Sequence, residues 1–246
     1  MTNSEKTKRK GTKVYRGAYN YMRNNNIYCE ETFEVFKEKN DSGTLFSSQL
    51  ISRVSTGELL NITVDYKVNK DYLPTTVIIN KVLGNENVVE IFSFNSKRNI
   101  INYSFENSKG SKSAELNTTP KFFISTPAIA TSMLYLRSKK FDSTGKNYFN
   151  ILSSSNQWTY EEDPSFNAIA VERKTLSTEA RNFDGAQLQG VEYRIEQHNE
   201  ENPEEVTPYL KCFVSQHITI PYFLEDEQGT KIQVKYLNDL SDRDLD

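Results

Sequence analysis

The sequence is poor in the residues that most often carry catalytic or metal chemistry. Only two of its 246 residues are histidine, His198 and His217, and they stand on different predicted segments. No histidine pair has the spacing of a metal site, and neither a glycine-rich phosphate loop nor a Gly-x-Ser-x-Gly turn is present. We therefore expect no metal and no cofactor. Whether the protein is an enzyme stays open, and the sequence leans against it.

Cysteines, long apolar runs and an excess of one charge are also lacking. Cys29 and Cys212 lie far apart without metal-type spacing, which predicts two reduced, buried thiols. No apolar run is long enough to span a bilayer or to form a signal-peptide core, so we expect a cytoplasmic protein without an integral membrane segment. The 30 Lys and Arg residues against 33 Asp and Glu give no basic field, which argues against a nucleic-acid partner.

Alternation of apolar and polar residues is what the sequence has in abundance. It is clearest from Leu60 to Val68, where every second residue is apolar. Turn sequences of two to five residues separate such runs, among them Arg23-Asn24-Asn25-Asn26, whose asparagines tolerate left-handed backbone. Such short connections require antiparallel neighbours. The sequence thus predicts a mainly β protein, with a basic disordered tail at residues 1–12 and one domain at 13–240.

One stretch, Pro120 to Lys140, has helical rather than strand spacing. Its predicted apolar face combines Ile129, Ala130, Met133, Leu134, Arg137 and Phe141. Thr126 is a good N-cap and Pro127 suits the first helical position, so we expect an α-helix over about 127–140. A lone helix among many strands needs a curved surface to pack on. We therefore expect a single, strongly curved antiparallel sheet, a half-barrel, wrapped around this helix.

This order of elements resembles a known family. The long meander, the helix ending in Leu134-Tyr135-Leu136-Arg137 and the final hairpin turn at Asp226-Glu227-Gln228-Gly229 are similar to the bacterial half-barrel proteins grouped with the periplasmic lipoprotein carriers and the mycobacterial lipoprotein LppX. The resemblance covers about Val14 to Leu237. It implies an open sheet curled around a helix, with an apolar cavity between them that takes acyl chains or another hydrophobic ligand.

Carboxylates on apolar faces are the first candidates for chemistry. Glu31 shares a predicted face with Cys29 and Phe33, and Glu90 shares one with aromatic residues. Burial would raise the pKa of such a carboxyl and suit it to general acid or base catalysis. His217 lies on an alternating run and can point into a cavity. Glu31 and His217 are therefore weak catalytic candidates, although each can equally fill a structural position.

The ligand-binding candidates are aromatic, flexible or basic. Tyr15, Tyr19 and Tyr21 share one predicted strand face, and tyrosine combines flat apolar surface with a polar tip. Met133 on the helix adapts to irregular ligands. Arg137 can hold a carboxylate or phosphate with two hydrogen bonds, or can pair with a structural acid. His217 completes this set.

Three hypotheses on function follow. The first is a soluble carrier for a lipid or other hydrophobic small molecule, held between the curved sheet and the helix. The second is an enzyme that acts on such a molecule by acid-base chemistry, with Glu31, Arg137 and His217 as its polar groups. The third is a protein-interaction module that uses a sheet edge or an open mouth.

Overall fold

The first half of the chain is an antiparallel meander of eight strands. The computed structural model describes residues 11–39, 43–137, 142–183, 185–198, 208–215 and 219–241. The strands of the meander are β1 (Thr12–Arg23), β2 (Asn26–Lys37), β3 (Gly43–Arg53), β4 (Leu59–Asn69), β5 (Pro74–Leu83), β6 (Glu86–Asn95), β7 (Ile100–Asn107) and β8 (Gly110–Asn117). Each pairs with the next in sequence. Most of the predicted disordered tail lies outside the described residues, and Thr12 already belongs to β1.

The alternation in the sequence sets the two faces of this meander. On β4, Val64, Tyr66 and Val68 are buried, as predicted, while the residues between them are more exposed. The predicted turn before β2 is also confirmed, because Asn24 and Asn25 have φ values of 52° and 63°. Asparagine adopts this left-handed conformation more readily than most residues. Local turn chemistry and a two-residue period therefore suffice to build this half.

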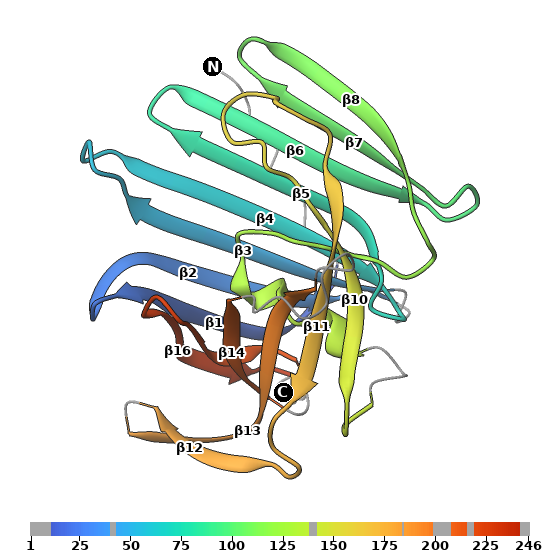
Figure 1. Ribbon diagram of the computed structural model, residues 1–246. Coiled ribbons are helices and arrows are strands. Elements are labelled where there is room, and N and C mark those ends of the chain that lie inside the picture. Colours follow the sequence, from blue (N-terminus) through green and yellow to red (C-terminus); the bar gives the residue numbers. More distant parts are fainter. Residues whose placement is uncertain are drawn as a thin grey trace.

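The second half of the chain completes the same sheet. Its strands are β9 (Phe123–Ile124), β10 (Lys146–Ser153), β11 (Ser165–Arg173), β12 (Glu179–Phe183), β13 (Ala186–His198), β14 (Tyr209–Ser215), β15 (Pro221–Asp226) and β16 (Thr230–Asp239). β16 pairs with β1 and joins the halves, and the sheet then continues through β15, β14, β13, β11 and β10 to β9. All described pairings are antiparallel except that of β9 with β10. The sheet is strongly curved and does not close (Figure 1).

Two details of the second half differ from the predictions. The run from Tyr209 to Ile220 predicts one strand from its sequence, but β14 ends at Ser215 in the described residues and β15 begins at Pro221. Alternation from Lys231 to Leu237 predicts that Tyr236 faces inward together with Ile232 and Val234, but Tyr236 is 43% exposed. The reason is a register shift, since Ala18 pairs with Tyr236 but the next residue of β1 pairs with Val234. The extra residue of β16 turns the tyrosine to the other face.

The predicted α-helix at 127–140 is wrong for the part that the structure describes, 127–137. Two short 3-10 helices stand there, η2 (Ile129–Thr131) and η3 (Leu134–Arg137). The Thr131 and Ser132 hydroxyls donate to the carbonyls of Ala128 and Ile129, 3.0 and 2.8 Å away. Such local side-chain bonds compete with helical backbone pairing.

Burial explains why the helical spacing misled. Ala128, Ala130, Thr131, Met133, Leu134 and Tyr135 are all buried, and three of them are consecutive, so the buried residues are not confined to one helical face. Figure 1 shows this green segment inside the curve of the sheet, behind β11. The expected position inside the sheet is therefore occupied by an irregular segment. Both cysteines are buried thiols without a disulfide.

A buried polar network ties the β10–β11 connection onto the meander. The Lys81 ammonium lies 2.9 Å from the Glu90 carboxylate and donates to the Asn156 carbonyl, also at 2.9 Å. The Tyr103 hydroxyl donates to Glu90 at 2.8 Å and accepts from the Asn156 side chain at 3.0 Å. In Figure 1 this connection lies over β5 to β7. Glu90 is thus buried, as its sequence pattern suggested, but in an ion pair that supports the fold.

Within the described residues, no helix has the length and apolar character needed to cross a membrane. The cytoplasmic location expected from the sequence stays a prediction.

Candidate functional site

The segment 122–137, called the inner segment below, is fixed to the sheet at its start. The Ile124 N–H donates to the Tyr66 hydroxyl on β4 at 3.1 Å, and the Ser125 N–H donates to the Leu152 carbonyl on β10 at 2.8 Å. These bonds join strands from both halves of the chain through one short stretch. The inner segment consequently forms a wall between the meander and the returning strands.

Glu31 fixes the middle of the inner segment. Its carboxylate accepts the Tyr21 hydroxyl at 2.5 Å and the N–H groups of Ile129 and Ala130 at 2.9 and 3.4 Å. Glu31 is 0% exposed. Burial raises the pKa of this carboxyl, and the hydrogen bonds from Tyr21 and Ile129 oppose that shift. Burial and the Glu31 charge also raise the pKa of Tyr21, which keeps its hydroxyl a donor.

This geometry makes Glu31 an anchor for the inner segment. A general acid or base has to reach substrate directly or through one water. The donors around Glu31 come from the protein itself, and Glu31 does not line the three cavities described below. Glu31 therefore contacts none of these three cavities, where a substrate for the catalytic role considered from the sequence would have to bind.

A cavity of about 990 Å³ lies along the edge of β10. β9 pairs with β10 at Ile151 and Leu152, so among the described strands residues 146–150 pair with β11 alone. The cavity fills the gap between this edge and the turn that joins β4 to β5. Its apolar lining consists of Tyr72, Leu73, Phe123, Leu134, Tyr148 and Phe149. The volume falls at the upper end of the range for small-molecule sites, about 300–1,000 Å³.

The charged lining of this cavity is mostly basic. Among the described residues, Lys70, Lys121, Arg137 and Lys146 line it together with a single carboxylate, Asp71. Lys146 also forms an ion pair with Glu196 at 2.5 Å, outside the lining. Glu196 raises the pKa of Lys146, which therefore stays charged.

Arg137 is held in place by an aromatic ring. Its guanidinium carbon lies 5.0 Å from the centre of the Tyr72 ring, a cation–π distance. Tyr72 has a φ of 61°, which is uncommon for a bulky residue. The Asn69 side chain stabilises this turn by accepting the N–H groups of Asp71 and Leu73 at 2.9 and 3.1 Å. The turn thus presents Tyr72 to Arg137 in an otherwise unfavourable conformation.

Aromatic side chains separate this cavity from a second apolar space. The Phe149 ring lies 4.9 Å from that of Tyr135 and 6.2 Å from that of Phe123. On the outer side, Tyr148 contacts His198, with ring centres 4.6 Å apart. His198 therefore lies at the cavity. Among the described residues, no cluster of His, Cys, Asp and Glu could hold a metal ion.

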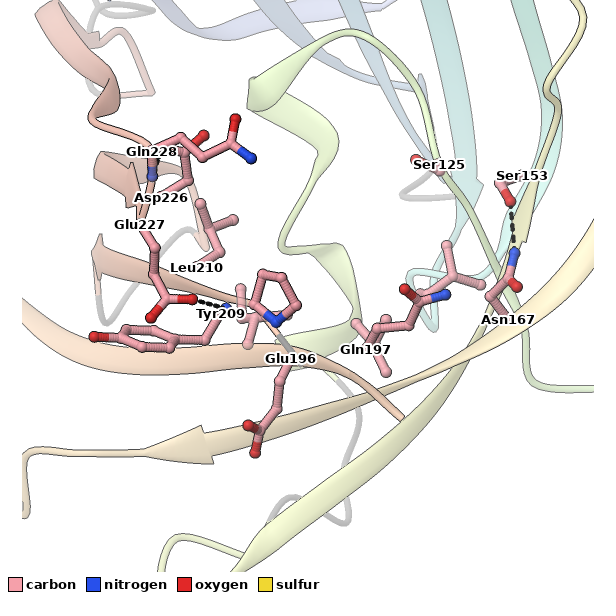
Figure 2. Close-up of a pocket in the computed structure, with 14 residues that line it drawn as sticks. Ser125, Ser153, Asn167, Glu196, Gln197, Tyr209, Leu210, Asp226, Glu227 and Gln228 are labelled. Atoms are coloured by element: carbon pink, nitrogen blue, oxygen red, sulfur yellow. Dashed lines mark hydrogen bonds between the residues drawn. The ribbon is translucent and has the colours of Figure 1, made fainter. Parts of the chain in front are cut away.

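Two smaller cavities, of about 190 and 480 Å³, adjoin on the other side of the wall. They share a lining of Ser125, Ile151, Ile169, Ile195 and Leu210. Figure 2 shows the larger one, with Asp226, Glu227 and Gln228 on one side and Ser153 and Asn167 on the other. Its polar groups bind one another, since Asn167 donates to Ser153 at 2.8 Å and the Tyr209 N–H donates to Glu227 at 3.2 Å.

The residues predicted to bind ligand lie in different places. Arg137 lines the 990 Å³ cavity and Met133 lines the 190 Å³ cavity. Tyr19 is fully buried and donates to the Pro221 carbonyl at 2.8 Å, and Tyr21 binds Glu31. Tyr15 is half-buried, and burial and Asp239 raise its pKa while Arg137 lowers it. His217 lies outside the described residues.

Several lining residues were missed by reasoning from the sequence. Lys70 and Tyr72 belong to a turn, Lys121 precedes β9, and Phe149 lies on a strand with weak alternation. A lysine in a turn looks like any solvated lysine, because only the fold brings these segments together. The one usable signal was the apolar character of Phe149.

No protein-family model and no curated protein matches the chain. Among solved structures, the chain is similar to a β-barrel-like protein of the domain of unknown function DUF1849 from Brucella abortus, with a TM-score of 0.59, 9% identity, and coverage of 94% of this chain and 99% of that one. It is also similar to a DUF1089 family protein from Pseudomonas aeruginosa, with a TM-score of 0.51, 11% identity, and coverage of 80% and 89%. These likenesses show a β-barrel-like fold. They do not name the lipoprotein-carrier family.

Proposed function

We propose that this protein binds a hydrophobic small molecule or lipid in the 990 Å³ cavity between the inner segment and the strands around it. The observation that carries the proposal is the lining, where Phe123, Leu134 and Phe149 come from the inner segment and β10. An apolar, concave space with a few polar groups is the usual form of a small-molecule site. The resemblance to lipoprotein carriers points to the same class of ligand.

The three cavities along the inner segment favour ligand binding over simple core packing. Protein interiors are normally packed with few voids larger than a water molecule. Here three cavities border one segment of sixteen residues, while that segment stays fixed by Glu31, Tyr66 and the β10 backbone. A wall fixed by hydrogen bonds can keep a space open for a ligand without collapsing into it.

One observation favours the alternative that the protein is a protein-interaction module. β8 pairs only with β7 among the described strands, and its residues are mostly exposed. An exposed edge of this kind can accept a further strand from a partner. The enzyme alternative has no comparable support, because Glu31 serves as an anchor.

A cavity-filling variant tests the proposal. Ala168 on β11 lines the cavity and is half-buried, so Ala168→Trp should fill part of the space without removing a core contact. Binding of the neutral fluorescent probe N-phenyl-1-naphthylamine should be measured by titration. We expect saturable binding to the wild type and an affinity reduced by about tenfold or more in Ala168→Trp.

The matched control is Ala180→Trp, which adds the same side chain at an exposed position of β12, outside the cavity. It should bind the probe like the wild type. Circular dichroism should show that both variants are folded, and Ala168→Leu replaces the tryptophan variant if that one does not fold. Absence of saturable binding to the wild type, or equal affinities in Ala168→Trp and Ala180→Trp, would contradict the proposal.

A further inference from the structure

We infer that the ligand of the 990 Å³ cavity is an amphipathic anion, an apolar body that carries one carboxylate or phosphate group. This inference rests on the proposed function and specifies its ligand class. The first observation is the charge of the lining, with four cationic side chains against the carboxylate of Asp71. The whole chain carries a net charge of −3, so this concentration of positive charge runs against the average composition of the protein.

The second observation concerns which of these charges the protein itself neutralises. Lys146 has its partner in Glu196. Lys70 and Lys121 form no ion pair with a carboxylate of any described residue. They come from different segments that the fold brings to the same cavity. With Lys146 paired to Glu196, the cations Lys70, Lys121 and Arg137 still outnumber the carboxylate of Asp71 in the lining, which gives a positive potential that attracts an anion.

The third observation is the placement of Arg137. Its guanidinium is a planar group suited to bidentate binding of carboxylate or phosphate, and stacking on Tyr72 limits the orientations that it can take. The strained turn that positions Tyr72 supports this arrangement. A guanidinium that is oriented before binding loses less entropy when it binds an anion.

The fourth observation is the separation of polar and apolar lining. Lys70 and Lys121 are exposed and stand at the rim, whereas Phe123 and Leu134 are buried. An elongated amphipathic molecule fits this gradient with its apolar body against the phenylalanine and leucine and its anionic group among the cations. A neutral hydrophobic molecule would use the apolar half alone, and a cationic one would meet repulsion at the rim.

The experiment compares ligands of equal chain length and different charge. Dodecanoate, dodecyl phosphate, dodecanol and dodecyltrimethylammonium should each displace N-phenyl-1-naphthylamine at pH 8, below their micellar concentrations. We expect the two anions to displace the probe at concentrations roughly tenfold or more below that of dodecanol, since hydrogen bonds to charged groups are the stronger ones. The trimethylammonium compound should be the weakest, and added salt should reduce the advantage of the anions.

The variant Lys121→Gln/Arg137→Gln tests the assignment to residues. Its affinity for dodecanoate should be lower than that of the wild type by about tenfold or more, while its affinity for dodecanol should stay within about twofold of the wild-type value. Lys112→Gln, which removes one charge from an exposed position of β8 outside the cavity, is the control. If the double variant does not fold, Lys121→Gln alone changes an exposed side chain and should show a smaller loss of the same kind.

The outcomes separate this inference from the proposed function. If the probe binds and dodecanol competes as well as dodecanoate, the anion inference fails and the binding function stands. The inference also fails if the double variant loses affinity equally for dodecanoate and for dodecanol. If the probe does not bind to the wild type at all, both fall.

Discussion

The Lys81–Glu90 ion pair predicts a large loss of stability when its cation is removed. The two side chains are only 9% and 2% exposed and their charged atoms lie 2.9 Å apart. At that distance the attraction is about 6 kcal/mol for an effective dielectric constant of about 20. Lys81→Met leaves Glu90 as a buried charge, and within the part of the chain that the structure describes it retains the Tyr103 hydroxyl as its one side-chain donor. We expect the free energy of unfolding to fall by about 3–5 kcal/mol.

Two further variants show whether the stranded charge is the cause. Lys81→Met/Glu90→Gln removes both charges and keeps an acceptor for Tyr103, so it should be more stable than Lys81→Met alone. Lys67→Met is the matched control, because Lys67 pairs with Glu38 at 2.7 Å where both side chains are partly exposed. An exposed pair of this kind contributes below about 1 kcal/mol.

Urea unfolding measures these differences, with circular dichroism for the sheet and fluorescence of the single tryptophan for the connection over β5 to β7. Trp158 lies on that connection, and its carbonyl accepts the Asn107 side chain at 2.9 Å. The reasoning is refuted if Lys81→Met costs no more than Lys67→Met, or if the double variant is no more stable than Lys81→Met.

Two other predictions concern the inner segment. The pKa of Glu31 is raised in the folded protein, so its contribution to stability is full below the unfolded-state pKa and is lost as pH rises through the folded-state pKa. As the pH rises from about 4 to 8, the free energy of unfolding should therefore fall less in Glu31→Gln than in the wild type, as measured by urea unfolding. Parallel curves of unfolding free energy against pH for the two proteins would rule this out. Tyr66→Phe leaves the Ile124 N–H without its acceptor, which should cost about 1–3 kcal/mol in thermal unfolding, and a variant as stable as the wild type would show that the bond is unimportant.

Most of the meander could be predicted from the sequence because its information is local. The alternation of β4 and the Asn24-Asn25 turn each act over a few residues, and each strand of the meander pairs with its neighbour in sequence. In the second half the pairing of β1 with β16 joins distant segments. The register shift that exposes Tyr236 has no sequence signal of its own, since it depends on the partner strand.

The helix prediction failed for a different reason. The spacing from Ile129 to Arg137 fits one helical face, yet it fits equally an irregular segment whose buried residues are not confined to one face. Besides the local bonds of Thr131 and Ser132, the irregular segment is held by Glu31, about a hundred residues away in sequence, which accepts the N–H groups of Ile129 and Ala130. Glu31 and Glu90 were candidates for burial from their strand faces, but their partners could not be predicted, because those partners come from other strands and from connections.

The candidate site could be predicted only in outline. Met133 and Arg137 line cavities, as their place on the inner segment suggested, whereas Lys70 and Lys121 gave no signal. Their grouping follows from the curvature that brings the β4–β5 turn to the unpaired edge of β10. Curvature of this kind results from long-range pairing and not from any local pattern.

A crystal structure of the protein with 12-bromododecanoate shows directly whether the 990 Å³ cavity binds an amphipathic anion. The anomalous signal of bromine locates the apolar end of this ligand. We expect a bromine peak against Leu134 and Phe149, with the carboxylate near Arg137 and Lys121. A peak on the outer face of the sheet, or an empty cavity at a concentration that saturates the protein, would contradict it.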